Sequence, residues 1–423
     1  MRQGSDPPAL SSRGGVSGIG RVRSLLPLLV AASIPIGIVL LIVAVQPSVV
    51  KQPELYFAYA LLEATAFLLL FRFFDLYERE PLSILALMAA WGGTVAVAIA
   101  VIGNTALDNS LPRPVETVFG AAISAPLVEE SAKGAALLAA FMVSIWANKK
   151  FGLFKFEGLT DGLLYGAAVG LGFALVEDIL YFINATAEHG QVGDGLTVFL
   201  ERTSLLRLDM LLHPLATGAF GAGLGLAAWS LTRRGRIGFP LLGLLLAILT
   251  HAAWNGFNQL VLVERYGWHQ TSAWYTNHLH DRTLAQQMDR TFIHASEVFQ
   301  VLWWAFIVLW VVAIALWLRH QREVIRFELQ DEVGRGTLSQ EELEQILHYP
   351  ERSKSYWRLL LAGRFEEWRL VRRLHGKFVD LAFLKRRVSA QPSREHELSH
   401  MRRSIANVRG ELALAASDEL VAT

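Results

Sequence analysis

The chain has 423 residues, of which 53% are hydrophobic and 18% are charged, and its formal net charge is +1. Because the apolar residues lie in long blocks, this composition is typical of a membrane protein that crosses the bilayer several times. The balanced charge leaves no basic domain with which to bind nucleic acid. The chain has no cysteine, which excludes disulfides, thiolate metal sites and a cysteine nucleophile.

The apolar blocks predict an all-α fold of about eight transmembrane helices. Residues 1–22 are rich in glycine, serine and proline and are predicted to form a disordered tail. Residues 23–318 are predicted to form the transmembrane domain, with spans at about 25–45, 55–71, 82–102, 118–147, 160–183, 206–231, 239–263 and 292–318. A stripe of glycines at every fourth position predicts close packing of the fifth span against another helix; it consists of Gly158, Gly162, Gly166 and Gly170.

From about Arg319 the sequence becomes charged while it keeps helical apolar spacing. Ser339 and Glu342 have the spacing of a capping box, which begins a short helix. Residues 319–423 are therefore predicted to form a helical C-terminal domain, and the sequence does not identify its partner. Most lysines and arginines of the short loops fall on the side that carries both termini. The positive-inside rule therefore predicts a multi-pass protein of the cell membrane with cytoplasmic N- and C-termini.

Two adjacent carboxylates and a lysine lie in the middle of the fourth span, as Glu129, Glu130 and Lys133. Each charged residue costs roughly 2.5–3.5 kcal/mol near the centre of a membrane helix. Their sum, up to about 10 kcal/mol, is comparable with the whole net stability of a typical domain. We therefore expect these side chains to face a polar interior and to take part in chemistry there. The structural alternative is a buried ion pair that holds helices together.

Three other spans carry polar groups at compatible depths in the bilayer. Phe173 and Glu177 lie one turn apart in the fifth span, and His213 lies near the start of the sixth. His251 and Asn255 lie one turn apart in the seventh. Polar groups from several helices at similar depth indicate a functional constellation. Each also has a structural alternative. Glu177 could be a counter-ion for Lys133, His213 could be a hydrogen-bonded histidine at the membrane interface, and His251 and Asn255 could bond only to nearby backbone.

This ordered set of residues resembles the PrsW family of bacterial intramembrane proteases, within the superfamily that includes the type II CAAX prenyl endopeptidases. The resemblance rests on Glu-Glu-x-x-Lys at 129–133, Phe-x-x-x-Glu at 173–177, the His213 segment and His-x-x-x-Asn at 251–255. The acidic turn at 75–81 also resembles the turn that precedes the core of the family. The resemblance covers about residues 55–263, which are the predicted catalytic core.

The resemblance implies an endopeptidase that cleaves membrane-tethered proteins, such as an anti-sigma factor with a single span, within the lipid bilayer or at the membrane surface. Glu129 or Glu130 would be the general base that activates water. Glu177 stands where prenyl endopeptidases have a histidine that holds this water, and the His251 and Asn255 pair would stabilise the oxyanion. The predicted catalytic residues are thus Glu129, Glu130, Glu177, His213, His251 and Asn255, with Lys133 and Phe173 in support.

The sequence leaves a choice between a metal-free site and a zinc site. His213, His251 and Glu177 form a set of two histidines and one carboxylate that zinc would accept, with Glu129 left as the base. We favour a metal-free mechanism, because Lys133 places a positive charge beside the water site. Asn255, a poor zinc ligand, also stands where a second ligand from the same helix would be.

A second class of function uses the same buried charges without hydrolysis. A membrane binding protein or a transporter could employ them as a proton or cation relay. Inverted hydropathy repeats would favour that interpretation, and the sequence shows none.

Overall fold

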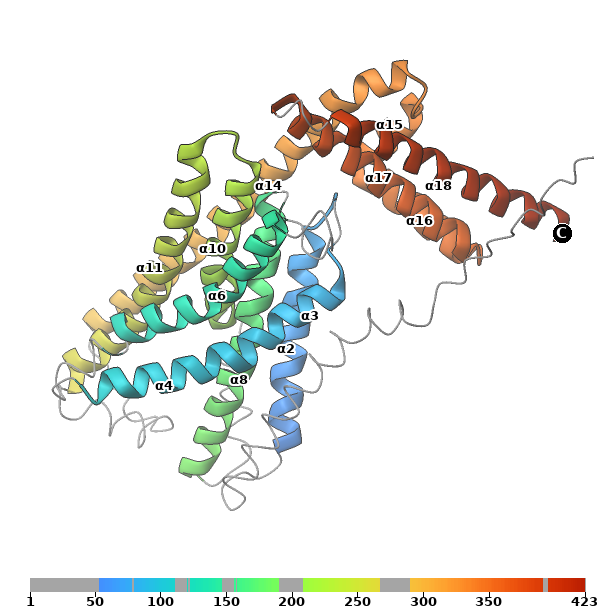
Figure 1. The fold of residues 1–423 in the computed structure, drawn as a ribbon. Helices are drawn as coiled ribbons and strands as arrows, with labels where there is room; N and C mark the ends of the chain where they lie inside the picture. Colours follow the sequence, from blue (N-terminus) through green and yellow to red (C-terminus); the bar gives the residue numbers. More distant parts are fainter. Residues whose placement is uncertain are drawn as a thin grey trace, which may run out of the picture.

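The computed structural model describes residues 53–77, 80–110, 120, 122–146, 156, 158–189, 208–266, 290–390 and 395–422. All regular structure in these ranges is helical, as the sequence predicts (Figure 1). The predicted N-terminal tail at 1–22 and the predicted first span at 25–45 lie outside the described residues.

The first part of the chain forms a bundle of helices that pack around α8 (Figure 1). The bundle begins with α2 (Pro53–Phe73), α3 (Leu82–Trp91), the π-helical turn η1 (Gly92–Ala96) and α4 (Val97–Asp108). It continues with α6 (Ala125–Trp146), α8 (Leu159–His189), η3 (Asp209–Leu211), α10 (Leu212–Trp229) and α11 (Arg233–Tyr266). The long helix α14 (Arg290–Gly334) follows.

Four helical segments of the described chain are long and apolar enough to cross a membrane, at Leu82–Leu107, Leu159–Leu180, Arg233–Phe257 and Val298–Gly334. The protein is therefore a polytopic helical membrane protein. The apolar window of α8 is 89% buried, whereas those of α11 and α14 are each 22% buried. Helix α8 is thus enclosed by its neighbours, while α11 and α14 expose rows of leucine and valine side chains, as expected of helices that face lipid.

Helices α2, α6 and α10 match three further predicted spans but do not belong to these four segments. Helix α6 carries three charged residues within one turn, which lowers its hydropathy. The sequence predicts a start of the sixth span at about 206, whereas α10 begins at Leu212. The reason is the backbone of Leu208, whose φ of 48° ends any helix that reaches it.

The predicted glycine stripe of α8 is confirmed as a packing surface. A Cβ on Gly162 would lie 1.9 Å from the carbonyl oxygen of Gly221 on α10, and a Cβ on Gly221 would lie 2.0 Å from the oxygen of Gly162. On another side of α8, a Cβ on Gly172 would lie 1.8 Å from the oxygen of Ala89 on α3. Only glycine permits such close approach of two helix backbones. These contacts fix α10 and α3 against α8.

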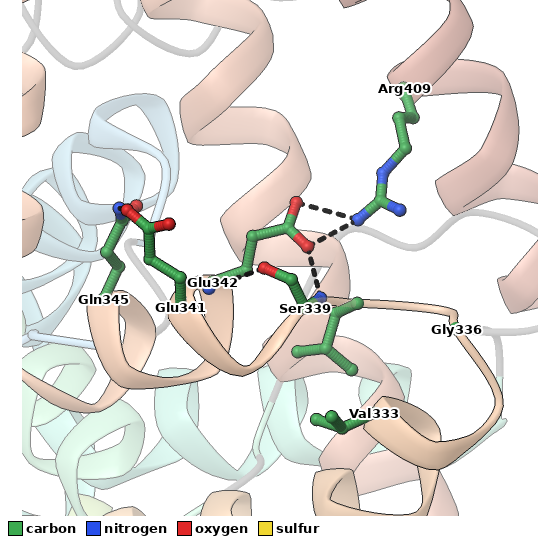
Figure 2. A pocket seen from close by; sticks show the side chains of 8 residues that line it. Val333, Gly336, Ser339, Glu341, Glu342, Gln345 and Arg409 are labelled. Carbon is green, nitrogen blue, oxygen red and sulfur yellow. Dashed lines mark hydrogen bonds and ion pairs between the residues drawn. The ribbon is translucent and has the colours of Figure 1, made fainter.

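The C-terminal part of the chain forms a second hydrophobic cluster at one end of the bundle (Figure 1). Its helices are α15 (Gln340–Leu347), α16 (Tyr349–Leu361), α17 (Phe365–Ala390) and α18 (Glu395–Ala422). They pack with the last turns of α14, which runs without a break through Arg319. The predicted capping box is confirmed: Ser339 Oγ accepts from the Glu342 backbone, and the Ser339 backbone donates to the Glu342 carboxylate (Figure 2).

Candidate functional site

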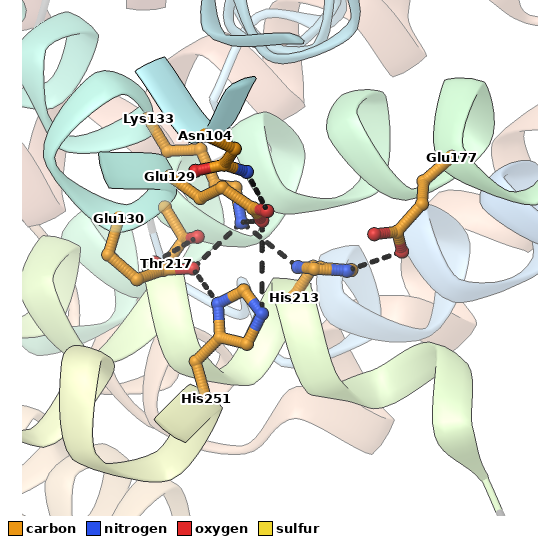
Figure 3. A network of polar contacts seen from close by, with 8 residues as sticks. All are labelled: Asn104, Glu129, Glu130, Lys133, Glu177, His213, Thr217 and His251. Carbon is orange, nitrogen blue, oxygen red and sulfur yellow. Dashed lines mark hydrogen bonds and ion pairs between the residues drawn. The ribbon is translucent and has the colours of Figure 1, made fainter. Parts of the chain in front are cut away.

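The charged residues of α6 form a compact buried group (Figure 3). The exposed fraction of the side chain is 9% for Glu129, 1% for Glu130 and 0% for Lys133. Lys133 Nζ lies 2.8 Å from Glu130 Oε1 and 3.4 Å from Glu129 Oε2. The spacings of three and four residues place both carboxylates on the same helix face as the ammonium. The lysine therefore neutralises part of their charge.

Two histidines from other helices complete this group. On α10, His213 Nδ1 lies 3.0 Å from Lys133 Nζ, and its Nε2 lies 2.8 Å from Glu177 Oε2 on α8. An ammonium group only donates, so Nδ1 accepts the hydrogen bond and Nε2 carries the proton that Glu177 accepts. On α11, His251 Nδ1 lies 2.9 Å from Glu130 Oε1. The carboxylate accepts from Nδ1, and His251 Nε2 faces Glu129 Oε2 at 3.8 Å.

Phe173 lies against the centre of the group. Lys133 Nζ is 3.8 Å from the centroid of the Phe173 ring, which is within the range of a cation–π contact. The same ring lies 5.1 Å from that of His213. Asn255 is half-buried one turn beyond His251, and none of the contacts found among the described residues joins it to the group. Apart from Asn255, the structure thus brings together all the predicted site residues.

Two polar residues that sequence reasoning missed also belong to the group. Asn104 on α4 donates from Nδ2 to Glu129 Oε1 at 3.3 Å, and Thr217 on α10 donates from Oγ1 to Glu130 Oε2 at 2.8 Å. Thr217 lies one turn after His213, a spacing that would have placed both on one helix face. Asn104 has no such signal, because it lies beyond the predicted end of its span at 102.

Glu129, His213 and His251 could together hold a metal ion, since one ligand atom from each lies within 4.8 Å of the others. The sequence predicts Glu177 in this set, and the structure instead places Glu177 on the outer nitrogen of His213. Contacts of this kind orient histidines that bind metals. However, Lys133 Nζ lies 3.0 Å from His213 Nδ1 and 3.4 Å from Glu129 Oε2, so the ammonium lies among the atoms that would bind the ion.

The fold and the site define a polytopic membrane protein with a buried group of glutamates, histidines and lysine. This group is consistent with the active site of a peptidase. Residues 80–274 match the sequence model of the PrsW family intramembrane metalloprotease, and the chain therefore contains a domain of this family. All residues of the buried group lie within this range. No curated protein and no solved structure matches the chain.

Proposed function

We propose that this protein is an intramembrane endopeptidase that hydrolyses membrane-tethered proteins, with Glu129 as the general base. The expected substrate is a protein with a single membrane span, similar to an anti-sigma factor. The family match supports the reaction class. The observation that carries the residue assignment is the unequal hydrogen bonding of Glu129 and Glu130.

The carboxylate of Glu130 is fully engaged within the protein. Its Oε1 contacts Lys133 at 2.8 Å and His251 at 2.9 Å, and its Oε2 accepts from Thr217 at 2.8 Å. Glu129 has two longer contacts, at 3.3 Å with Asn104 and at 3.4 Å with Lys133, and its side chain is the more exposed of the two. A general base needs a lone pair within reach of water. Glu129 meets this condition, and Glu130 anchors Lys133 and His251.

Hydrolysis then proceeds without a covalent intermediate. Glu129 takes a proton from water as the water oxygen forms a bond to the carbonyl carbon of the substrate. The same proton passes to the amide nitrogen as the bond between carbon and nitrogen breaks. His251 Nδ1 already donates to Glu130, so Nε2, near Glu129, can donate to the oxyanion when the ring carries both protons. Asn255 stays the predicted second donor.

We propose that this mechanism is metal-free, because of the position of Lys133. A zinc ion bound by Glu129, His213 and His251 would polarise the substrate carbonyl and activate water. Glu129 would then be a ligand, and the remaining carboxylate of the pair, Glu130, has its oxygens engaged by three donors. When the Lys133 ammonium lies between these side chains in place of zinc, Glu129 is not a metal ligand and remains available as the base.

We also propose that the protein lies in the cell membrane with cytoplasmic termini. The count of lysines and arginines in the short loops supports this orientation. Residues 319–423 would then form a cytoplasmic domain below about eight spans.

The test of the function is cleavage of a co-expressed single-span protein, followed by its fragments on a gel. Glu129→Gln keeps shape and removes the base, so we expect normal abundance and thermal stability with no cleavage. Glu130→Gln loses its ion pair with Lys133 and weakens its hydrogen bond with His251, and we expect it to lose stability as well as cleavage. The matched control is Glu366→Gln, whose side chain is 68% exposed, and it should cleave normally. Undiminished cleavage by Glu129→Gln would sink the assignment of the base.

A further inference from the structure

Asn104 approaches Glu129 from a helix that contributes nothing else to the buried group. Its Nδ2 donates to Glu129 Oε1, and in Figure 3 it meets the carboxylate on the side opposite His251. The orientation of the amide follows from this contact, since the reverse orientation would place a carbonyl against a carboxylate. Asn104 Oδ1 is buried and accepts no hydrogen bond from the part of the chain that the structure describes. A buried acceptor without a donor is unfavourable and calls for an explanation.

We propose that Asn104 Oδ1 binds the hydrolytic water together with Glu129, which makes Asn104 a catalytic residue. This inference rests on the proposed role of Glu129 as the base. A water molecule that bridges two acceptors donates one hydrogen to each and keeps a lone pair for the substrate. Glu129 removes one proton, and the other hydrogen stays on the attacking oxygen, bonded to Asn104. The oxygen then forms its bond to the carbonyl carbon, and the proton on Glu129 leaves with the amine.

The two acceptors lie within the reach of one bridging water. The oxygen and nitrogen of an amide share one carbon atom, so Oδ1 lies no more than about 5.5 Å from the carboxylate oxygen that Nδ2 contacts. A water with two hydrogen bonds of about 2.8 Å spans about 4.5 Å. Glu129 and Asn104 therefore provide two partners for an ordered water, which is the minimum for a buried one.

The π-helical turn η1 explains why Asn104 faces the group. It precedes α4, and a turn of this kind shifts the residues after it by about 100° around the helix axis. The turn is held against α8, because a Cβ on Gly92 would lie 1.9 Å from the Val169 oxygen and a Cβ on Gly93 2.8 Å from the Gly172 oxygen. Helix α4 thus has a fixed rotation relative to the helix that carries Glu177. π-helical turns occur often at functional sites.

The kinetic test compares Asn104→Leu with Asn109→Leu, the same change at an exposed position at the end of the same helix. With a single-span reporter protein that the wild type cleaves, we expect kcat of Asn104→Leu to fall at least about 100-fold with little change in KM, because the side chain holds water and not substrate. Asn109→Leu should behave as wild type. Thermal melting curves in detergent are the check that both variants are folded. Unchanged kcat in Asn104→Leu, in a protein whose Glu129→Gln variant is inactive, overturns the inference and leaves the proposed function intact.

A second measurement needs no substrate. Infrared spectra of the full protein in D2O should contain an O–D stretch of ordered water that shifts when D2¹⁸O is used. We expect this band to disappear in Asn104→Leu, to shift in Glu129→Gln, whose amide oxygen is a weaker acceptor than a carboxylate, and to persist in Asn109→Leu. A band that persists in folded Asn104→Leu overturns the inference. If the band behaves as expected while Glu129→Gln still cleaves, the water site stands and its role in hydrolysis is overturned together with the proposed base.

Discussion

Lys133 is the residue on which the two possible mechanisms differ. Its ammonium contacts both glutamates and His213, and its side chain has no exposed surface. Removal of one partner from a buried ion pair leaves an uncompensated charge, which costs about 3–5 kcal/mol. A divalent ion among Glu129, His213 and His251 would have to displace this ammonium. Glu129 and His213 thus belong both to the contacts of Lys133 and to the three residues that could hold a metal ion.

Metal removal distinguishes the metal-free mechanism from a zinc-dependent one. We expect that purified, active protein contains no stoichiometric zinc and that exhaustive chelation leaves cleavage unchanged, because Lys133 supplies the positive charge of the site. Elemental analysis of the same preparation and cleavage assays before and after chelation provide the measurement. The contrary result is stoichiometric zinc whose removal stops cleavage and whose return restores it. His213 and His251 would then be ligands.

The sequence predicts the charged part of the site better than its neutral part. Glu129, Glu130 and Lys133 stand out because charges in an apolar helix are costly. Asn104 carries no charge and lies 25 residues from its partner, so neither cost nor spacing marks it. Asn255 has a helical spacing from His251 that suggests a shared role, but one turn moves a side chain about 5.4 Å along the axis. The sequence predicts Glu177 beside both histidines, where the structure has Glu129. Which carboxylate lies there depends on how the two imidazole rings are turned, and residue spacing does not predict that orientation.

At the scale of elements, the packing of α8 against α10 sets the distance between Glu177 and His213. These helices meet through reciprocal contacts of Gly162 and Gly221, where each glycine faces the backbone oxygen of the other. The glycine spacing in the sequence is sufficient to predict such a surface. It does not reveal which helix occupies it, because many small residues occur in every span of this chain.

Gly162→Ala is expected to separate the two helices. The added Cβ would lie 1.9 Å from the Gly221 oxygen, so α10 must move, and overpacking of this kind costs about 1–3 kcal/mol. We expect a lower melting temperature and weaker cleavage, because His213 moves away from Glu177. Gly410→Ala is the matched control: its Cβ would meet nothing within 4 Å, and alanine favours a helix by about 1 kcal/mol. Equal melting temperatures for Gly162→Ala and wild type would contradict the packing.

The ends of two helices differ from the predicted ends of their spans. The lipid bilayer limits the length of the apolar segment, whereas backbone hydrogen bonds limit the length of the helix. The sequence predicts spans that end at about 102 and 318, where the apolar residues end. Helix α4 continues to Asp108 and α14 to Gly334, since the hydrogen bonds of a helix extend into polar sequence without lipid around them. Hydropathy therefore predicts that these helices exist and leaves their ends open.

At the scale of the whole molecule, contacts among the described residues join the bundle to the C-terminal cluster. Arg352 on α16 donates a hydrogen bond to the backbone oxygen of Leu76, in the segment between α2 and α3. Trp229, at the end of α10, packs against Trp317 and Phe383 and lies 3.8 Å from the guanidinium of Arg386. Both contacts join elements of the family domain or its border to the C-terminal helices. The C-terminal cluster thus packs against the bundle and stabilises the ends of α2 and α10.

His375 should make the stability of the C-terminal cluster depend on pH. Burial, together with the positive charge of Arg352, lowers the pKa of His375 from 6.5 to about 4. His375 Nδ1 lies 2.9 Å from the Tyr356 hydroxyl, within hydrogen-bond distance. Between these two pKa values the unfolded chain binds a proton that the folded chain does not, so stability is full above about pH 6.5 and falls as the pH drops toward about 4. The total loss is roughly 3 kcal/mol.

Hydrogen exchange of the full protein, corrected for intrinsic rates, measures this effect in α16 and α17. We expect the free energy of opening to fall between about pH 7 and pH 5 in wild type. His375→Gln keeps a hydrogen-bonding group beside Tyr356 and does not titrate, so its opening free energy should not change over this range. His400→Gln, at an exposed position, should follow wild type. If His375→Gln shows the same decline as wild type, another group carries the pH dependence, and the buried neutral histidine is not what links the stability of this cluster to pH.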